Sequence, residues 1–224
     1  MMAGLIVTID GPAGAGKTST ARGVAERFGY RYLDTGALYR TLALAVLRSG
    51  AADPLGPDAV EVCRRAEVRP RWRGSAMDVL LDGEDVSGSI RAPEVTGLVS
   101  PLSANPEIRS LLIRIQRGAA GEGGLVVEGR DIGTVVFPEA PVKIYLFADI
   151  DERARRRARE MERAGLTVDP VELRRAIAER DRRDSGRAVA PLKRPADAID
   201  VDTTGMTLEG QIERIVRIVR EAGG

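Results

Sequence analysis

Short apolar runs alternate with longer segments of helical periodicity along this chain. Five runs of four to six residues have the apolar character of strands buried on both faces. They are Leu5–Asp10, Tyr30–Leu33, Leu125–Glu128, Val142–Phe147 and Ala198–Val201. Because strands that alternate with helices form parallel sheets, the pattern predicts an α/β fold with a parallel core sheet and helices on both of its faces.

The helical segments carry start and stop signals. Apolar residues at 21, 24, 25 and 28 follow the spacing of one helix face, and Gly29 ends the pattern. Asn105-Pro106 is an N-cap followed by a first-turn proline. The predicted helices cover Ala21–Phe28, Leu38–Leu47, Pro106–Ile115 with a buried stripe at 108, 111, 112 and 115, Asp151–Ala164, a segment from an Asp169 cap toward Asp184, and Leu208–Val219 after a Thr207 cap.

The stretch from Ala51 to Ala104 differs from the rest because it is rich in proline. Within it, Val79–Leu81 and Glu84–Val86 flank Asp82-Gly83, a pair that favours a tight hairpin. We therefore expect an insertion with its own small sheet. A length of 224 residues fits one domain that carries such an insertion.

The segment Gly11-Pro12-Ala13-Gly14-Ala15-Gly16-Lys17-Thr18 matches the P-loop pattern GxxxxGK[ST]. Its glycines allow successive backbone amides to surround phosphate oxygens, at the positive end of the following helix. In such loops the lysine reaches the β- and γ-phosphates, and the hydroxyl of the next residue binds Mg²⁺. A purely structural glycine turn is the alternative. The strand before and the helix after favour a nucleoside-triphosphate site.

Composition excludes several classes of chemistry. The chain has no histidine and a single cysteine, Cys63, which removes His-based catalysis, His and Cys metal clusters and an internal disulfide framework. A net charge of +1 argues against a dedicated nucleic-acid binder. No apolar run is long enough for a membrane span, and no signal-peptide pattern is present. We expect a cytoplasmic protein that binds neither nucleic acid nor membrane.

Arginine makes up 31 of the 34 basic residues. Genomic base composition is the simplest cause, but it does not explain where the arginines lie. The γ-phosphoryl group could go to water or to a second substrate. An acceptor that is itself a phosphate needs no general base, because its attacking oxygen is already anionic. It needs several cations to hold two polyanions in line, and arginines suit that task.

Five segments together resemble the bacterial cytidylate kinase family, in the family's order and over most of the chain. They are IDGPAGAGKTS (9–19), LDTGALYR (33–40), LDGEDVSGSIR (81–91), EGRDIGTVVFPEAPVKIYL (128–146) and ERDRRDSGRAVAPL (179–192). The resemblance implies a P-loop kinase that phosphorylates CMP or dCMP with ATP and Mg²⁺. It also implies a single domain over 1–224, with a core (about 1–34, 105–150 and 185–224), a nucleoside-monophosphate region with the insert (about 35–104) and a helical lid (about 151–184).

The same resemblance assigns site residues. On the donor side it implies Gly11, Pro12, Ala13, Gly14, Ala15, Gly16, Lys17, Thr18, Ser19 and Arg156 for ATP and Mg²⁺, with Thr18 as the metal ligand. On the acceptor side it implies Thr35, Arg40, Ser100, Arg109, Arg130, Asp131, Arg180, Asp184 and Arg187 for CMP. Arg153, Arg156 and Arg157 would be lid arginines that close over ATP. The catalytic residues would be Lys17, Arg130, Arg153 and Arg157, and Asp131 would accept from the cytosine amine.

Spacing alone supports these roles only weakly. Arg180, Asp184 and Arg187 share one helical face if the helix continues that far, and Arg153 and Arg157 are four residues apart. Charge runs of this kind are usually solvated, salt-bridged faces. Three alternatives stay open: a P-loop kinase for another small acceptor, such as another nucleotide, dephospho-coenzyme A or shikimate; a slow regulatory ATPase; and an Arg-rich nucleic-acid module. We expect a monomer.

Overall fold

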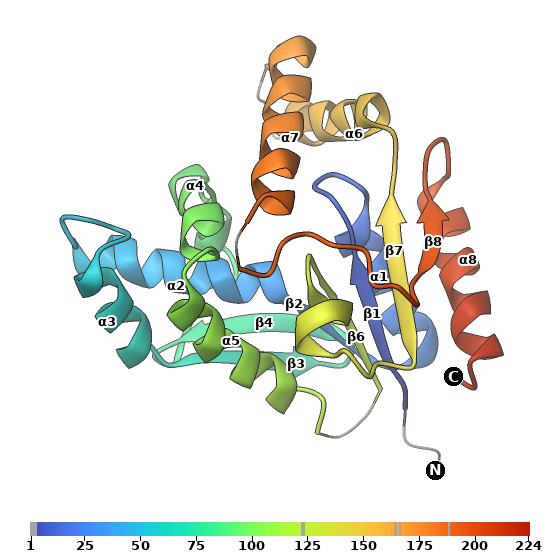
Figure 1. The fold of residues 1–224 in the computed structure, drawn as a ribbon, viewed down its shortest axis with the longest axis horizontal. Helices are drawn as coiled ribbons and strands as arrows, with labels where there is room; N and C mark the ends of the chain where they lie inside the picture. The colour runs from blue at the N-terminus through green and yellow to red at the C-terminus, as the bar shows by residue number, and fades with distance from the viewer. Residues whose placement is uncertain (1–3, 122–123, 164, 166, 188) are drawn as a thin grey trace.

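A parallel sheet forms the centre of the molecule (Figure 1). The computed structural model describes residues 4–121, 124–163, 165, 167–187 and 189–224. Within these residues, five parallel strands lie in the order β2-β6-β1-β7-β8. Their bounds are β1 (Ile6–Asp10), β2 (Arg31–Asp34), β6 (Leu125–Gly129), β7 (Val142–Phe147) and β8 (Ile199–Asp202). The predicted sheet is confirmed, and each strand lies within a residue of its predicted bounds.

Helices cover both faces of this sheet because successive side chains of each strand point in opposite directions. In β6, Val126 packs with the core around α1 (Lys17–Phe28) and α8 (Leu208–Glu221). Leu125 and Val127 pack on the other face, with α2 (Thr35–Ser49) and α5 (Pro106–Gly118). On α5 the predicted stripe is buried at 108 and 112, whereas 111 and 115 are only partly buried.

The insertion contains the small sheet that the sequence predicts. Strands β3 (Val68–Arg73), β4 (Ala76–Leu81) and β5 (Glu84–Asp85) are antiparallel. At the predicted hairpin, Asp82 and Gly83 have φ values of 51° and 86°, as a tight two-residue turn requires. Strand β3 contains Pro70, which is tolerated because β3 lies at an edge of its sheet.

Two helices in the insertion were not predicted, α3 (Pro57–Arg65) and α4 (Pro93–Leu102). A short 3₁₀ turn, η1 (Ser89–Arg91), precedes α4. Each of these helices has a proline in its first turn. Proline is pre-organised for that position, since it has no amide hydrogen to leave unpaired. Two of the prolines in this segment, Pro57 and Pro93, therefore mark helix starts.

Two charged helices, α6 (Ile150–Arg163) and α7 (Pro170–Ser185), stand beyond the ends of the sheet strands (Figure 1). The predicted Asp169 cap is confirmed, because its side chain accepts a hydrogen bond from the Val171 amide at 2.8 Å. The predicted end of the first helix, Ala164, lies outside the described residues. Among the described residues, no helix is both long enough and apolar enough to cross a bilayer.

Candidate active site

The P-loop connects β1 to α1 directly, so the predicted strand–loop–helix context is confirmed. Its backbone leaves no room for side chains at two glycines. A Cβ on Gly11 would lie 1.9 Å from the Leu146 carbonyl oxygen, and Gly16 has a φ of 93° just before the helix begins. The loop therefore presents backbone amides at the start of α1, which is the arrangement that binds phosphate.

Lys17 is the first residue of α1, and its side chain is buried beside the loop. Its Nζ donates a hydrogen bond to the Pro12 carbonyl oxygen at 2.7 Å. Burial lowers the pKa of Lys17 to about 7, and the nearby Arg130 guanidinium adds to this effect. Negative charge arriving beside Nζ would restore its protonated form.

Two side chains with oxygen atoms lie close together beside the P-loop: Thr18 at the end of the loop and Glu128 near the end of β6. Thr18 is exposed at the mouth of the loop. Glu128 is buried and accepts a hydrogen bond from the Tyr32 hydroxyl. Burial raises the pKa of Glu128, as does the nearby Asp34 carboxylate, whereas Lys17 and the hydrogen bonds from Tyr32 and Thr18 lower it.

Two of the predicted lid arginines contact the loop backbone. Arg153 is buried; its Nη1 donates to the Ala13 carbonyl oxygen at 3.0 Å and pairs with Asp181 on α7. Arg156 donates to the Ala15 carbonyl oxygen at 3.3 Å. Arg157 is different, because its side chain is 51% exposed and pairs only with Glu160 on its own helix among the contacts described.

Asp184 joins two of the predicted acceptor-site arginines. Its buried carboxylate accepts from Arg130 Nε at 3.0 Å and from Arg187. Arg187 also donates to the Ser100 hydroxyl at 3.2 Å, which links the segment after α7 to α4. Helix α7 ends at Ser185, so Arg187 does not share its helical face as the spacing had suggested. Its contact with Asp184 nevertheless brings it to the same site.

Further cations surround this group. Burial lowers the pKa of Arg180 to about 10, and Arg130 and Arg40 lower it further while Asp184 raises it. Arg40 donates from Nη2 to Asp34 at 2.8 Å, and its buried Nε has no hydrogen-bond partner among the described residues. Thr35 donates to the Glu128 carbonyl oxygen at 2.7 Å. The arrangement gathers positive charge near Lys17 of the P-loop, where an anion would be favoured.

Arg109 and Asp131 form a buried ion pair close to these cations. Arg109 also donates from Nη1 to the Tyr39 hydroxyl at 3.1 Å. Burial raises the pKa of Asp131, and the Arg109 guanidinium opposes that rise. The pair combines one fixed acceptor and one fixed donor, which is the pattern needed to read the edge of a nucleobase.

Comparison with known proteins decides the family. A family model described as cytidylate kinase matches residues 7–221, which is nearly the whole chain. The chain belongs to the cytidylate kinase family. The resemblance drawn from the five sequence segments is thereby confirmed.

Curated cytidylate kinases are similar to this chain over nearly their full length. The cytidylate kinase of Geobacter sulfurreducens is 46% identical over 218 residues, covering 97% of this chain and 94% of that protein. The cytidylate kinase of Desulfitobacterium hafniense is 43% identical and is covered to 95%. A bifunctional pantoate ligase/cytidylate kinase of Synechococcus elongatus is 45% identical, but this chain covers only 42% of it.

Solved structures support the fold alone. An uncharacterised protein from Eubacterium ventriosum superposes with a TM-score of 0.53 at 14% identity, covering 96% of this chain and 98% of that one. At this identity the likeness carries no information about substrates. The α/β architecture of the cytidylate kinase family is therefore found again in a distant protein.

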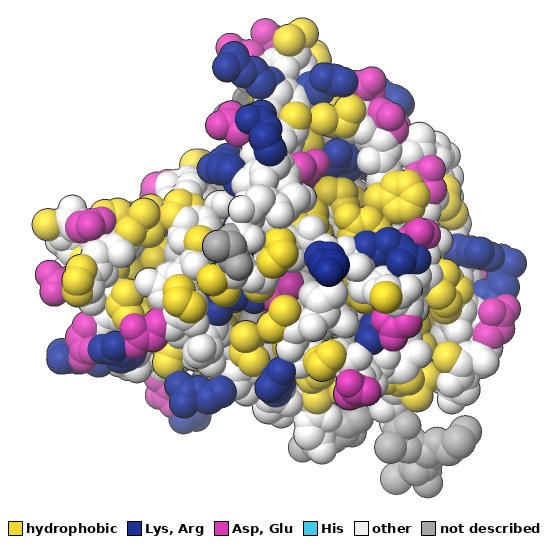
Figure 2. Space-filling view, in the orientation of Figure 1, with side chains coloured by type: hydrophobic (Ala, Val, Ile, Leu, Met, Phe, Trp, Pro, Cys, Tyr) yellow, Lys and Arg dark blue, Asp and Glu magenta, His cyan; other side chains and the backbone are white. Residues whose placement is uncertain are grey.

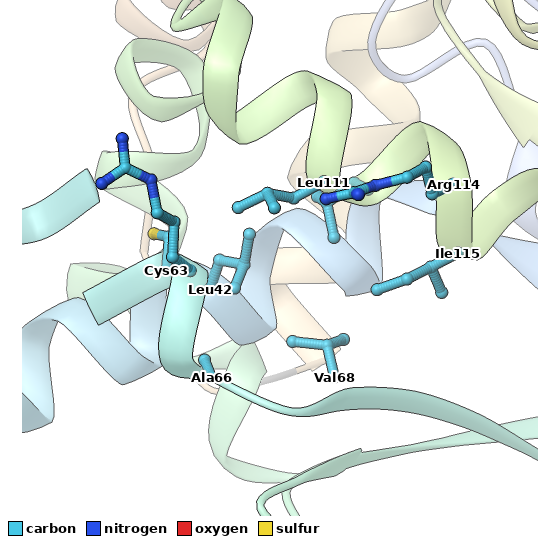
Figure 3. A pocket seen from close by; sticks show the side chains of 9 residues that line it. Leu42, Cys63, Ala66, Val68, Leu111, Arg114 and Ile115 are labelled. Atoms are coloured by element: carbon cyan, nitrogen blue, oxygen red, sulfur yellow. The ribbon is translucent and has the colours of Figure 1, made fainter. Parts of the chain in front are cut away.

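On the face of the molecule drawn in Figure 2, the described residues form no continuous basic patch of the kind that binds nucleic acid. Figure 2 shows basic and acidic side chains interspersed over the body and over helices α6 and α7. A cavity of about 220 Å³ lies between α2, α3 and α5, with Leu42, Cys63 and Leu111 in its wall (Figure 3). None of its lining residues belongs to the predicted cytidylate kinase site, so it is separate from that site.

Sequence reasoning gave no role to three residues that the structure places at the site. Asp181 accepts from the Ala13 amide at 3.4 Å, and the Tyr39 hydroxyl accepts from Arg109. Asp10 bonds to the segment after Asp131. All three lie within quoted family motifs. The signal for Asp10 was a charged residue at the end of an otherwise apolar strand.

Proposed function

We propose that this chain transfers the γ-phosphoryl group of ATP to the phosphate of CMP or dCMP, forming ADP and CDP or dCDP. Membership of the cytidylate kinase family supports the reaction class. The structural observation that supports this reaction is a second group of cations near the P-loop: Asp184 joins Arg130 and Arg187, and Arg130 and Arg180 lie close enough to Lys17 to lower its pKa. Two polyanions can thus be held apart and in line.

On the donor side, the P-loop amides and Lys17 would hold the β- and γ-phosphates, with Ser19 beside them. Arg153 and Arg156 add positive charge next to the loop, since both already donate to its carbonyl oxygens. Arg157, which is half exposed, would reach the triphosphate when the lid closes. We assign residues 151–184 to that lid and residues 35–104 to the acceptor region.

The residues present fit a Mg²⁺ ion that arrives with ATP. No cluster of three or more acidic, His or Cys ligands exists among the described residues. Mg²⁺ commonly takes only one or two protein oxygens and completes its shell with substrate phosphates and water. Thr18 would supply the hydroxyl, with the Glu128 carboxylate close by. When bound, the ion would neutralise negative charge on the β- and γ-phosphates.

On the acceptor side, Arg40, Arg130 and Arg187 would hold the monophosphate. Arg180, Asp184 and Thr35 would contact the sugar end, and Ser100, Arg109 and Asp131 the base. An oxygen of the CMP phosphate forms the new bond to the γ-phosphorus, and the bond from that phosphorus to the β,γ-bridging oxygen breaks. No proton has to be removed, because the attacking oxygen is anionic. This agrees with a chain that has no histidine.

Lid closure would exclude water, which otherwise competes as the phosphoryl acceptor. We propose that the enzyme acts as a monomer. The test is coupled ADP release with CMP, dCMP, UMP, AMP, dephospho-coenzyme A and shikimate compared side by side. Strong stimulation by CMP or dCMP supports the proposal. Slow ATP hydrolysis that does not respond to CMP would point instead to a regulatory ATPase.

A further inference from the structure

Asp10 is a buried carboxylate to which the reaction above gives no part. It is the last residue of β1, immediately before the P-loop, and its side chain is 0% exposed. Its Oδ1 accepts from the Ile132 amide at 2.8 Å, and its Oδ2 accepts from the Gly133 amide at 2.7 Å. One carboxylate thus binds two successive backbone amides that lie 122 and 123 positions away in the sequence.

These two amides begin the short π-helical turn η2 (Ile132–Val136), which directly follows Arg130 and Asp131. The first amides of a helical turn have no partner inside the turn, so an external acceptor is needed to satisfy them. A carboxylate makes stronger hydrogen bonds to them than a neutral acceptor does. Asp10 therefore fixes where the turn begins.

The turn lies directly against β1. A Cβ on Gly133 would lie 3.0 Å from Thr8 Oγ1 and 3.3 Å from Asp10 Oδ2. The same Cβ would also lie 3.0 Å from Pro195. A side chain at this position would crowd β1, so glycine favours the close approach by which the Asp10 carboxylate reaches both amides.

Burial disfavours the ionised form of the Asp10 carboxyl group. Burial raises the pKa of Asp10 to about 6; the hydrogen bonds from Gly133 and Ile132 oppose the rise, Asp131 adds to it and Lys17 lowers it. At neutral pH the group is therefore largely ionised although buried. Protein cores usually contain apolar side chains, and a buried charge that departs from this rule is typical of a functional site.

We propose that Asp10 is a positioning residue for acceptor recognition: by holding the start of η2, it sets where Arg130 and Asp131 stand relative to the P-loop. The inference rests on the proposed function, because it requires that Asp131 read the base. It goes beyond that function because it assigns an effect on acceptor choice to a residue of β1, the strand that precedes the P-loop. Asp10 itself need not touch either substrate.

The test is Asp10→Asn. Asparagine keeps the shape of the side chain, but its NH₂ group would face one of the two backbone N–H groups, which are themselves donors, so one of the two hydrogen bonds is lost. We expect kcat/KM for CMP to fall about 10- to 100-fold and the CMP/UMP ratio of kcat/KM to fall about tenfold, since a small misplacement of reacting groups is costly. The KM for ATP should change by less than about twofold. Thr8→Val is the matched control. Thr8 is equally buried on the same strand, and its hydroxyl has no hydrogen-bond partner among the described residues.

A merely structural role would not change the CMP/UMP ratio. If that ratio is unchanged in Asp10→Asn, or if the KM for ATP changes instead, the proposal is overturned. If the variant fails to fold, Gly133→Ala decides, because it displaces the turn while keeping the carboxylate. It should lower the same ratio, and an unchanged ratio would contradict us. Failure of wild-type protein to phosphorylate CMP would instead refute the proposed function.

Discussion

The Arg109 guanidinium and the Asp131 carboxylate form an ion pair whose side chains are only 4% and 9% exposed. Both come from separate segments, α5 and the turn after β6, and each is held by a second contact. Arg109 donates to Tyr39, and the backbone after Asp131 is bound by Asp10. Loss of one partner of a buried ion pair strongly destabilises the folded protein, because the other charge stays buried without compensation.

Removal of Arg109 should therefore be costly to the fold. We expect Arg109→Met to lower the free energy of unfolding by about 3–5 kcal/mol, because it leaves the Asp131 carboxylate buried without its partner. The measurement is urea unfolding followed by circular dichroism. Arg114→Met, an exposed substitution on the same helix, should change stability by less than about 0.5 kcal/mol. Equal effects of the two substitutions would refute this account of the pair.

Asp131 should decide between cytosine and uracil. Cytosine presents an amine at the position where uracil has a carbonyl oxygen, so a carboxylate there accepts from CMP and repels UMP. Asp131→Asn keeps the shape but can donate to uracil. We expect the CMP/UMP ratio of kcat/KM to fall by about tenfold or more, as one lost hydrogen bond to a charged group allows. Steady-state kinetics with both nucleotides would measure it, and an unchanged ratio would exclude Asp131 as the discriminator.

Asp184 should support acceptor binding through its two arginines. Asp184→Asn weakens the hold on Arg130 and Arg187 together, so the KM for CMP should rise about tenfold while the KM for ATP changes little. Asp200→Asn provides the control, because Asp200 pairs with Arg194 at the surface. A rise in the KM for ATP alone would place Asp184 on the donor side and contradict the assignment.

ATP binding should take up protons near neutral pH. In the free protein the pKa of Lys17 is lowered to about 7, so about half of the molecules lack that proton at pH 7. Triphosphate oxygens beside Nζ raise this pKa, and binding then draws a proton from the buffer. Calorimetric titrations in buffers of different ionisation enthalpy would measure uptake of up to about 0.5 proton.

The size of this uptake should depend on pH. It should vanish well below pH 7, where Lys17 is already protonated, and it should be lost in Lys17→Met. Binding enthalpies that are independent of the buffer in the wild-type protein at pH 7 would be inconsistent with a lysine held near its midpoint.

Local pattern determined much of this structure. The apolar run at β1, the glycines of the P-loop and the Asp82-Gly83 hairpin each encode their conformation within a few residues. Helices α3 and α4 were missed because their prolines were taken as breaks, although proline in a first turn favours a helix.

The site was harder to predict because its contacts are long-range. Asp10 bonds to Ile132 across 122 residues, and Arg153 bonds to Ala13 across 140. Spacing along a helix cannot show such pairs. It suggested that Arg187 shares a face with Asp184 through α7, whereas the two meet because the chain turns after Ser185.

The central claim is that cations, without a proton-abstracting base, hold a second nucleotide opposite the P-loop. The most direct measurement is kcat with saturating ATP and CMP for wild-type protein, Lys17→Met and Arg130→Met, with the exposed Arg175→Met as control. The account predicts losses of about 10²- to 10³-fold in the first two variants and none in the control. Near-wild-type kcat in both Lys17→Met and Arg130→Met would contradict it.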